Sequence, residues 1–292
     1  MDDDDLNVES LRAKVAGIRA QRKKRACNND GCNDNGEKPK RRRKKAAGQC
    51  GPALDGNEFL KRFEEWRRST PGIEMMFKPS LSDYEREQLF ASMPLDDLMD
   101  KYAWAIPDDR AIRIIREFAP IVEVGAGKGY WARLLRDNGV DAIAYDKTVG
   151  RPGNWTRIEK GGPEDLSKHA DRALFLCYPD DFEDDAQYSL AEHCLRTYRG
   201  DTVILVGEML GSTMLENPWG KSIGPEAQLE LHARFHMVLR VPLPSFPVSR
   251  DTLSVWKRTR RFAIDDDFQF ADIDSQETID QTLSCPATAH LI

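Results

Sequence analysis

Glycines and acidic residues follow several short apolar runs in this sequence, at positions where residues that contact a ligand are expected. The run Ile121–Val124 leads into Gly125–Gly129, which has the sequence G-A-G-K-G. Later apolar runs end in Asp146, in Tyr178–Asp180 and in Gly207–Glu208. Glycine lets a backbone approach a ligand closely, and an ionised carboxylate accepts hydrogen bonds from hydroxyl or amine donors. The sequence therefore predicts a site for a nucleotide-like ligand.

The stretch from Ile121 to Asp146 has the pattern of a strand, a glycine turn, a helix and a second strand. Apolar residues at i, i+3 and i+4 predict a helix over Tyr130–Asn138, and Gly139 is suited to end it. The second strand, Ala142–Tyr145, leads directly into Asp146. This order predicts one βαβ unit that carries the ligand site at its turn.

Strands and helices go on alternating after this unit, which predicts an α/β fold with a mainly parallel sheet. Ligands on such sheets bind beyond the carboxyl ends of the strands, at the switch point in strand order. Glu123–Gly129, Asp146, Tyr178–Phe182 and Glu208 are all expected at that edge. The last two strands are expected as an antiparallel pair; the expected strands are Ile121–Val124, Ala142–Tyr145, Trp155–Glu159, Ala173–Tyr178, Thr202–Val206, Phe235–Val241 and Leu253–Thr259.

Charge divides the chain into a basic arm and an acidic body. Residues 1–50 hold 14 of the 43 basic side chains and 8 of the 49 acidic ones, a net charge of +6. The remaining residues hold 29 basic and 41 acidic side chains, a net charge of −12. The arm has few apolar residues to offset the entropy lost on ordering, so we expect residues 1–50 to be disordered. The other expected parts are a helical lead-in or lid over 51–110, a Rossmann-like domain over 111–262 and an acidic tail over 263–292.

The arm contains the basic run Lys38–Lys45, for which several interpretations stay open. The run resembles a nuclear localisation signal, its charge also suits nucleic acid, and it is equally compatible with a solvated linker. An acidic body does not suit a surface that follows phosphates, so any contact with nucleic acid is expected in the arm.

The six cysteines do not form a recognisable metal or disulfide framework. Cys27 and Cys32 lack a second pair or a histidine at ligand spacing, so no metal is expected. Met1 is followed by four aspartates rather than by a signal peptide, and no apolar stretch approaches the ~20 residues that a bilayer requires. We therefore expect an intracellular protein of the nucleus or cytoplasm with no membrane partner.

The glycine turn narrows the kind of nucleotide that is expected. The dinucleotide pattern G-x-G-x-x-G would place its third glycine at position 130, which is Tyr130. A tyrosine at the helix start would crowd a pyrophosphate, which makes NAD or FAD less expected. A Walker phosphate loop is excluded because no G-x-x-x-x-G-K-[ST] occurs.

Glu123–Gly129, followed at the expected spacing by Asp146, resembles motif I of class I S-adenosylmethionine-dependent methyltransferases. The likeness covers about half of the chain, from Ala111 to about Arg261. The segments Tyr102–Pro107 and Tyr198–Glu208 are also similar to an uncharacterised group of predicted methyltransferases. The resemblance implies a seven-stranded, doubly wound sheet with a terminal antiparallel pair, and S-adenosyl-L-methionine as cofactor.

The resemblance also implies a set of cofactor contacts. The three glycines of the turn would lie against the amino-acid part of the cofactor, and Asp146 would accept hydrogen bonds from both ribose hydroxyls. Tyr102 and Trp104 are expected either as plain core or as part of a lid over the turn. The full expected set is Glu123, Gly125, Ala126, Gly127, Gly129, Tyr130, Trp131, Asp146, Cys177, Tyr102 and Trp104.

Catalytic residues are expected after the fourth and fifth strands. Methyltransferases that act on nitrogens of nucleobases or glutamine often carry [D/N]-P-P-[Y/F/W] after strand four, where this chain has Y-P-D-D-F in Tyr178–Phe182. The pattern is half matched, so a nitrogen acceptor is a hypothesis only. The candidate catalytic residues are Tyr178, Asp180 and Glu208; the alternatives are that Asp180 caps the next helix and that Glu208 binds loop backbone.

Two other classes of function stay open beside methyl transfer to an unknown acceptor. One is a nicotinamide-dependent oxidoreductase built on the same sheet. The other is a non-catalytic methyltransferase-like binding module that uses the arm as a tether, although the intact motif argues against full decay of the cofactor site. The sequence leaves the oligomeric state unknown.

Overall fold

The computed structural model describes residues 56–70, 72–180, 188–213, 217–263, 269–279 and 283–292. The chain divides into two units, residues 1–48 and 49–292, and all the described residues belong to the second unit. The arm predicted to be disordered, with its basic run 38–45, therefore lies outside the described residues, as do Asp181 and Phe182. Among the described helices, none has the length and apolar character that crossing a membrane requires.

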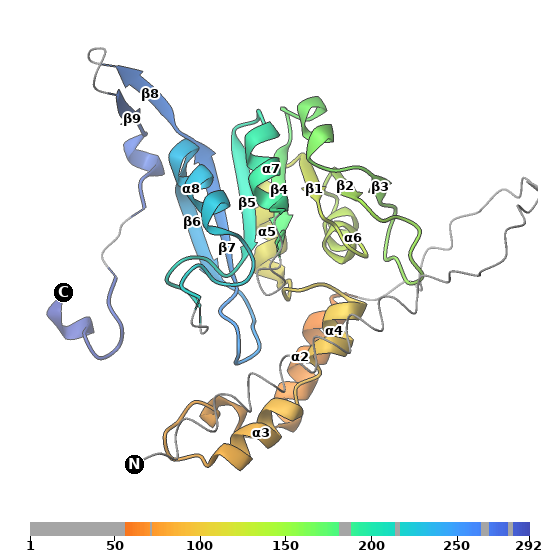
Figure 1. Cartoon of the computed structure of the whole chain (residues 1–292), viewed down its shortest axis with the longest axis vertical. Helices are drawn as coiled ribbons and strands as arrows, with labels where there is room; N and C mark the ends of the chain where they lie inside the picture. Colours follow the sequence, from red (N-terminus) through yellow and green to blue (C-terminus); the bar gives the residue numbers. More distant parts are fainter. Residues whose placement is uncertain (1–55, 71, 181–187, 214–216, 264–268, 280–282) are drawn as a thin grey trace, which may run out of the picture. The chain divides into compact units, whose positions relative to one another are not determined.

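A seven-stranded sheet forms the centre of the second unit (Figure 1). The strands are β1 (Ile121–Val124), β2 (Ala142–Asp146), β3 (Glu159–Lys160), β4 (Ala173–Cys177), β5 (Thr202–Gly207), β6 (Phe235–Pro242) and β7 (Thr252–Arg258). Their order across the sheet is β3-β2-β1-β4-β5-β7-β6. Strands β1 to β5 pair in parallel, and β7 is antiparallel to both β5 and β6. The predicted mainly parallel sheet with its antiparallel terminal pair is confirmed.

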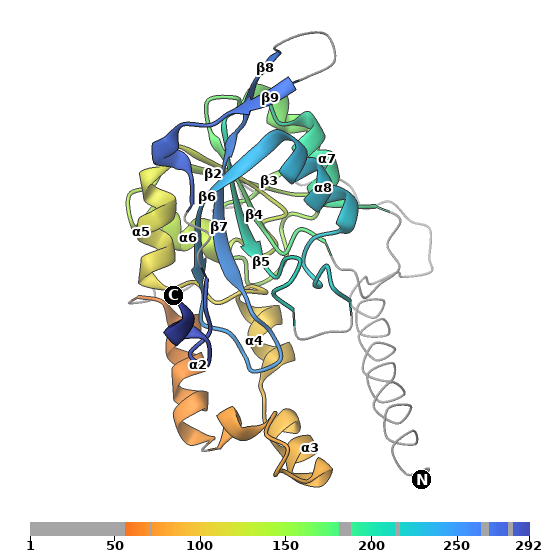
Figure 2. The ribbon, with the colours of Figure 1, turned by 90° about the vertical axis from the view of Figure 1, so that its left-hand side faces the viewer.

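Helices cover both faces of this sheet, as a doubly wound fold requires (Figure 2). One face packs against α5 (Asp109–Glu117) and α6 (Tyr130–Asp137). The other packs against the 3-10 helix η2 (Pro163–Lys168), α7 (Leu190–Thr197) and α8 (Pro225–Arg234). Successive strand residues face opposite sides: Ile121 belongs to the first core, and Val122 and Val124 belong to the second. Both faces are apolar because both are covered.

The lead-in consists of α2 (Glu58–Ser69), the 3-10 helix η1 (Ile73–Met75), α3 (Asp83–Ala91) and α4 (Leu95–Lys101). The Asn57 side chain caps α2, and Ser82 forms the predicted capping box with Glu85. The lead-in is tied to the sheet domain because the Tyr130 hydroxyl donates to Asn57 Oδ1 and accepts from Phe59 N, both at 3.0 Å. The helix that opens the βαβ unit is therefore held by the segment that precedes the domain.

Two parts of the chain differ from the expected elements. The third strand, β3, covers two residues and begins at Glu159, whereas the expected strand ran from Trp155 to Glu159. Trp155 lies before the strand, where it is buried and donates from Nε1 to the Lys101 carbonyl at 2.7 Å. The C-terminal region forms a second, two-stranded sheet from β8 (Arg260–Ala263) and β9 (Gln269–Asp272). It is followed by the short 3-10 helices η4 (Ser275–Glu277) and η5 (Ala289–Leu291).

Candidate functional site

The switch point of the sheet lies between β1 and β4, because the strand order continues to β2 and β3 on one side and to β5 on the other. The glycine turn follows β1 at this point. Asp146 ends β2, Tyr178 follows β4 and Glu208 follows β5. Because these strands are parallel, the topology brings all of the predicted site segments to one edge.

The three glycines of the turn adopt backbone conformations that L side chains rarely take. Their φ angles are +80° at Gly125, +58° at Gly127 and +78° at Gly129. A Cβ at Gly125 would come within 2.9 Å of Leu190, and one at Gly129 would meet neighbouring side chains at 3.1 Å. A Cβ at Gly127 would meet nothing within 4 Å. Gly127 is thus the glycine of the turn that borders open space.

The turn is shaped by hydrogen bonds to the end of β2. The amides of Gly125 and Ala126 donate to the Tyr145 carbonyl at 2.9 and 3.0 Å. The Gly127 amide donates to Asp146 Oδ2 at 2.9 Å, and the Thr148 amide donates to Oδ1 at 2.8 Å. Asp146 is 8% exposed. Each carboxylate oxygen has more than one acceptor position, so Asp146 can hold the turn and still accept from a ligand.

Glu123 is buried below the glycine turn. Its side chain is 2% exposed, and its Oε2 has no hydrogen-bond partner among the described residues. Burial raises the pKa of this carboxyl to about 8, and the nearby Asp146 adds to the rise, although the Arg136 guanidinium counteracts both. Glu123 is consequently mostly protonated at neutral pH and can donate a hydrogen bond as well as accept one.

Three aromatic residues of the expected cofactor set belong to the core. Tyr102, Trp131 and Tyr130 are at most 2% exposed. Tyr102 stacks on Phe59 and on Trp155 with ring centroids 5.0 and 5.3 Å apart. Each ring packs among neighbouring side chains, which agrees with the plain-core alternative stated for Tyr102; contact of these three residues with the cofactor stays a prediction.

Trp104 differs from Tyr102, with which it was predicted as a pair. It is 42% exposed, and its ring stacks on Tyr178 with centroids 6.0 Å apart. It therefore lies at the carboxyl edge of β4, where a lid over the site would be placed. Cys177, the last residue of β4, is half-buried, and burial raises the pKa of its thiol well above the usual value.

Tyr178 is held against a buried acid, Asp251, that is absent from the predicted catalytic residues. It has a φ of +47°, the only positive φ among the described non-glycine residues. Its hydroxyl donates to Asp251 Oδ1. Asp251 is 4% exposed, and burial raises its pKa to about 6 although the bond from Tyr178 acts in the opposite direction. Asp251 precedes β7, which is antiparallel, so strand direction was the signal that could have placed it at the carboxyl edge.

Of the two predicted catalytic acids, Asp180 binds the first residues of α7 and α8, and Glu208 binds loop backbone. Asp180 accepts from Ser189 Oγ at 2.8 Å, from Ala191 N at 3.2 Å and from Gly224 N at 3.2 Å. Glu208 is fully buried, and its Oε1 accepts from the Arg250 amide at 2.8 Å. Both arrangements correspond to the structural alternatives stated for these residues, since the carboxylates hold the loops that border the site.

Comparisons with known proteins find likenesses in structure alone. No family model and no curated protein matches this chain. An S-adenosylmethionine-dependent methyltransferase from Archaeoglobus fulgidus is 12% identical, with 51% of this chain and 90% of that chain covered and a TM-score of 0.35. The 1,6-didemethyltoxoflavin-N1-methyltransferase of Burkholderia thailandensis, solved with S-adenosylhomocysteine, is 14% identical, with coverages of 70% and 92% and a TM-score of 0.38. At these identities and TM-scores, the cofactors and acceptors of these proteins cannot be assigned to this chain.

Proposed function

We propose that this chain is an S-adenosylmethionine-dependent methyltransferase. The observation that carries the proposal is the turn after β1, at the switch point of the sheet. There, three glycines have positive φ, Gly127 borders open space, and the carboxylate of Asp146 lies beside it. A turn of this kind offers close backbone approach, and Asp146 offers acceptors for the two hydroxyls of a ribose.

The hydrogen bonds within the turn support this cofactor over a dinucleotide. A pyrophosphate is held by free backbone N–H groups at the glycine turn and helix start. Here the amides of Gly125, Ala126 and Gly127 all donate to acceptors of the chain itself. A cofactor with a ribose and no phosphate suits these groups better.

Methyl transfer from a sulfonium needs orientation and exclusion of water more than it needs a large catalytic apparatus. Holding two reactants in line supplies up to about 7–11 kcal/mol of the barrier. In this chain the turn and Asp146 would hold the cofactor, and Trp104 over Tyr178 would shield the reacting groups. Nitrogen as the accepting atom is supported by the half-matched segment that begins at Tyr178.

The proposal is tested by measuring the affinity of the purified chain for S-adenosylmethionine by calorimetry, with NADH as the comparison ligand. Gly127→Arg is expected to weaken binding by about 100-fold, equivalent to about 2.7 kcal/mol, because its side chain would fill the open space. Gly139→Arg is the matched control. Gly139 has a φ of +76° and equally open surroundings, but it lies at the far end of α6.

Three results would separate an S-adenosylmethionine site from a nicotinamide site, and transfer of a labelled methyl group from the bound cofactor separates an enzyme from a non-catalytic binding module. Binding of S-adenosylmethionine by the wild-type chain and by Gly139→Arg, but not by Gly127→Arg, supports the proposal. Binding of NADH alone would favour the oxidoreductase. Equal binding of S-adenosylmethionine by all three chains would show that the site lies elsewhere.

A further inference from the structure

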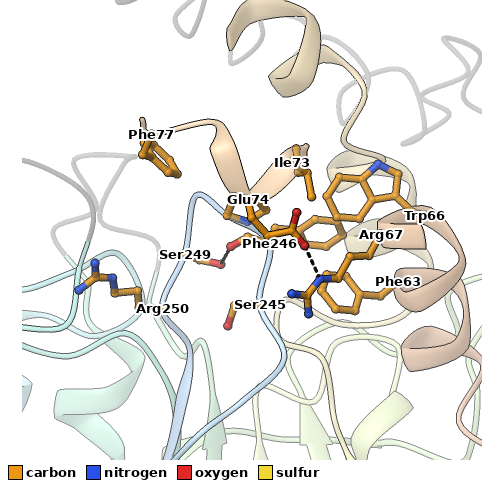
Figure 3. Close-up of a pocket in the computed structure, with 11 residues that line it drawn as sticks. Phe63, Trp66, Arg67, Ile73, Glu74, Phe77, Ser245, Phe246, Ser249 and Arg250 are labelled. Carbon is orange, nitrogen blue, oxygen red and sulfur yellow. Dashed lines mark hydrogen bonds and ion pairs between the residues drawn. The ribbon is translucent and has the colours of Figure 1, made fainter. Parts of the chain in front are cut away.

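Two adjoining cavities lie beside the carboxyl edge of the sheet. The first, of about 340 Å³, lies between α2, residues 73–77 and the loop 243–251 that joins β6 to β7 (Figure 3). The second, of about 450 Å³, extends along the same loop to Asp251 and Thr252. Both are lined by Phe63, Arg67 and Arg250, so together they form one groove. Volumes of this size suit a small organic molecule.

The outer part of the groove has aromatic walls. Phe246 from the β6–β7 loop packs on Phe63 with ring centroids 5.1 Å apart, and on Trp66 at 5.0 Å. Figure 3 shows these rings beside Arg67, which reaches toward Glu74, its ion-pair partner at 3.3 Å. Phe63 and Phe246 are almost fully buried and form the floor of this part of the groove. Trp66 is partly exposed and Phe77 is exposed, so their rings offer the surface on which a planar apolar group can pack.

The inner part of the groove ends at a carboxylate that is connected to the switch point. Asp251 accepts from the hydroxyl of Tyr178, the first residue after β4, and β4 is the neighbour of β1. Cys177, the last residue of β4, lies between the two sites: burial has the largest effect in raising the pKa of its thiol, and the charges of both Glu123, below the glycine turn, and Asp251 raise this pKa further. The acid end of the groove is therefore its end nearest the proposed cofactor turn.

We propose that this groove binds the methyl acceptor, a planar aromatic small molecule with an amine or hydroxyl group, and that Asp251 is the base that takes its proton. The inference rests on the proposed function. The acceptor's nitrogen or oxygen would attack the methyl carbon as the bond from carbon to sulfur breaks. The sulfur leaves with that electron pair as a neutral thioether, and the acceptor's proton moves to the Asp251 carboxylate. Tyr178 is a positioning residue in this scheme.

The surroundings of Asp251 give this base a recognisable pH dependence. Burial raises its pKa to about 6, so the ionised form needed for proton transfer decreases as pH falls through about 6. The bond from Tyr178 lowers this pKa, so Tyr178→Phe is expected to move the acidic limb of the rate profile to higher pH. The titratable and charged groups that face Asp251 are Tyr178, Lys221, Glu208 and Cys177.

The test uses the full chain, labelled S-adenosylmethionine and two fractions of a cell extract, one of small molecules and one of macromolecules. Asp251→Asn is expected to bind S-adenosylmethionine within about twofold of wild type, yet to lose about 100-fold or more of its transfer into the small-molecule fraction. Asp251→Glu is expected to restore part of the rate. Asp201→Asn, an exposed acid one residue before β5, is the matched control and is expected to transfer normally.

Several outcomes would overturn the inference while leaving the cofactor assignment intact. These are normal transfer by Asp251→Asn, an acidic limb that Tyr178→Phe does not move, and labelling of the macromolecular fraction alone. If Asp251→Asn fails to fold, the Tyr178→Phe profile decides the question. Absence of S-adenosylmethionine binding in the wild-type chain would instead overturn the proposed function together with this inference.

Discussion

Among the described residues, three of the five buried acids at the carboxyl edge have different surroundings and therefore suit different tasks. Asp146 accepts from two backbone amides and shapes the glycine turn. Asp251 accepts from a tyrosine hydroxyl and lines a cavity. Glu123 lies deeper and has an oxygen without a partner in the described part of the chain. Differences in burial and hydrogen bonding, rather than residue type, separate their roles.

Glu123 should make the stability of the chain depend on pH. Its pKa is near 4.5 when solvated and about 8 in the folded chain, because burial disfavours the charged form. The folded state binds more protons than the unfolded state between these values, so stability is lost as pH rises from about 4.5 through about 8. Glu123→Gln carries no charge at any pH. We expect its free energy of unfolding to exceed that of wild type by a margin that grows across this window.

Urea denaturation at several pH values measures that margin. Glu117→Gln, a substitution of an exposed glutamate at the end of α5, serves as the control and should show a constant difference from wild type. A margin for Glu123→Gln that stays constant or shrinks as pH rises would show that the buried carboxyl is not the source.

At the scale of elements, the glycine turn is held by helices that precede the sheet. Lys128 donates to the Asp100 carbonyl, and Trp155 Nε1 donates to the Lys101 carbonyl. These carbonyls belong to the last two residues of α4. The Tyr130 hydroxyl connects the start of α6 to the start of α2. The lead-in thus fixes the turn from outside the βαβ unit.

Asp180 joins three segments around the end of β4, so its removal should affect stability. Asp180→Ala leaves Ser189 Oγ, Ala191 N and Gly224 N without their acceptor. We expect a loss of about 3 kcal/mol in the free energy of unfolding, since each bond contributes about 1 kcal/mol. Ser189→Ala removes one of these bonds and the N-cap bond from the Glu192 amide, so it should cost about 2 kcal/mol. A normal unfolding curve for Asp180→Ala together with lost methyl transfer would instead assign Asp180 a catalytic role.

The whole chain combines a basic segment before residue 51 with an acidic remainder. The basic run 38–45 lies outside the described residues, so its role as a localisation signal or a nucleic-acid contact stays a prediction. The acidic remainder would oppose a duplex lying across the folded body. A small-molecule acceptor in the groove needs no contribution from the arm.

Replacing the six basic residues of Lys40–Lys45 with serine separates these roles. If the arm binds nucleic acid, the substitution should weaken binding to a labelled duplex and flatten the dependence of log K on log salt by about 0.9 for each lost phosphate contact. Fluorescence anisotropy over a series of salt concentrations measures both effects. The affinity for S-adenosylmethionine should not change. A duplex affinity equal to that of wild type would exclude this run as the contact.

Local patterns predicted much of this fold correctly. Strands β1, β2, β4 and β5 follow apolar runs, the turn follows the glycines, and Asp146 follows the second strand. These features depend on neighbours in sequence, which a pattern of residue types describes directly. The prediction placed the third strand too early because it took the apolar Trp155 as a strand residue. In the structure, Trp155 packs against Tyr102 of the lead-in and is not part of β3.

The sequence by itself determined the α/β class, the position of the glycine turn and the acid that faces it, because each depends on a few consecutive residues. Only the tertiary structure decided which aromatic residues are core and which border the site. Tyr130 and Tyr102 are buried by helices distant in sequence, whereas Trp104 remains exposed on Tyr178. Only the structure brought Asp251 to Tyr178, 73 residues apart, because the antiparallel return of β7 places that loop at the carboxyl edge.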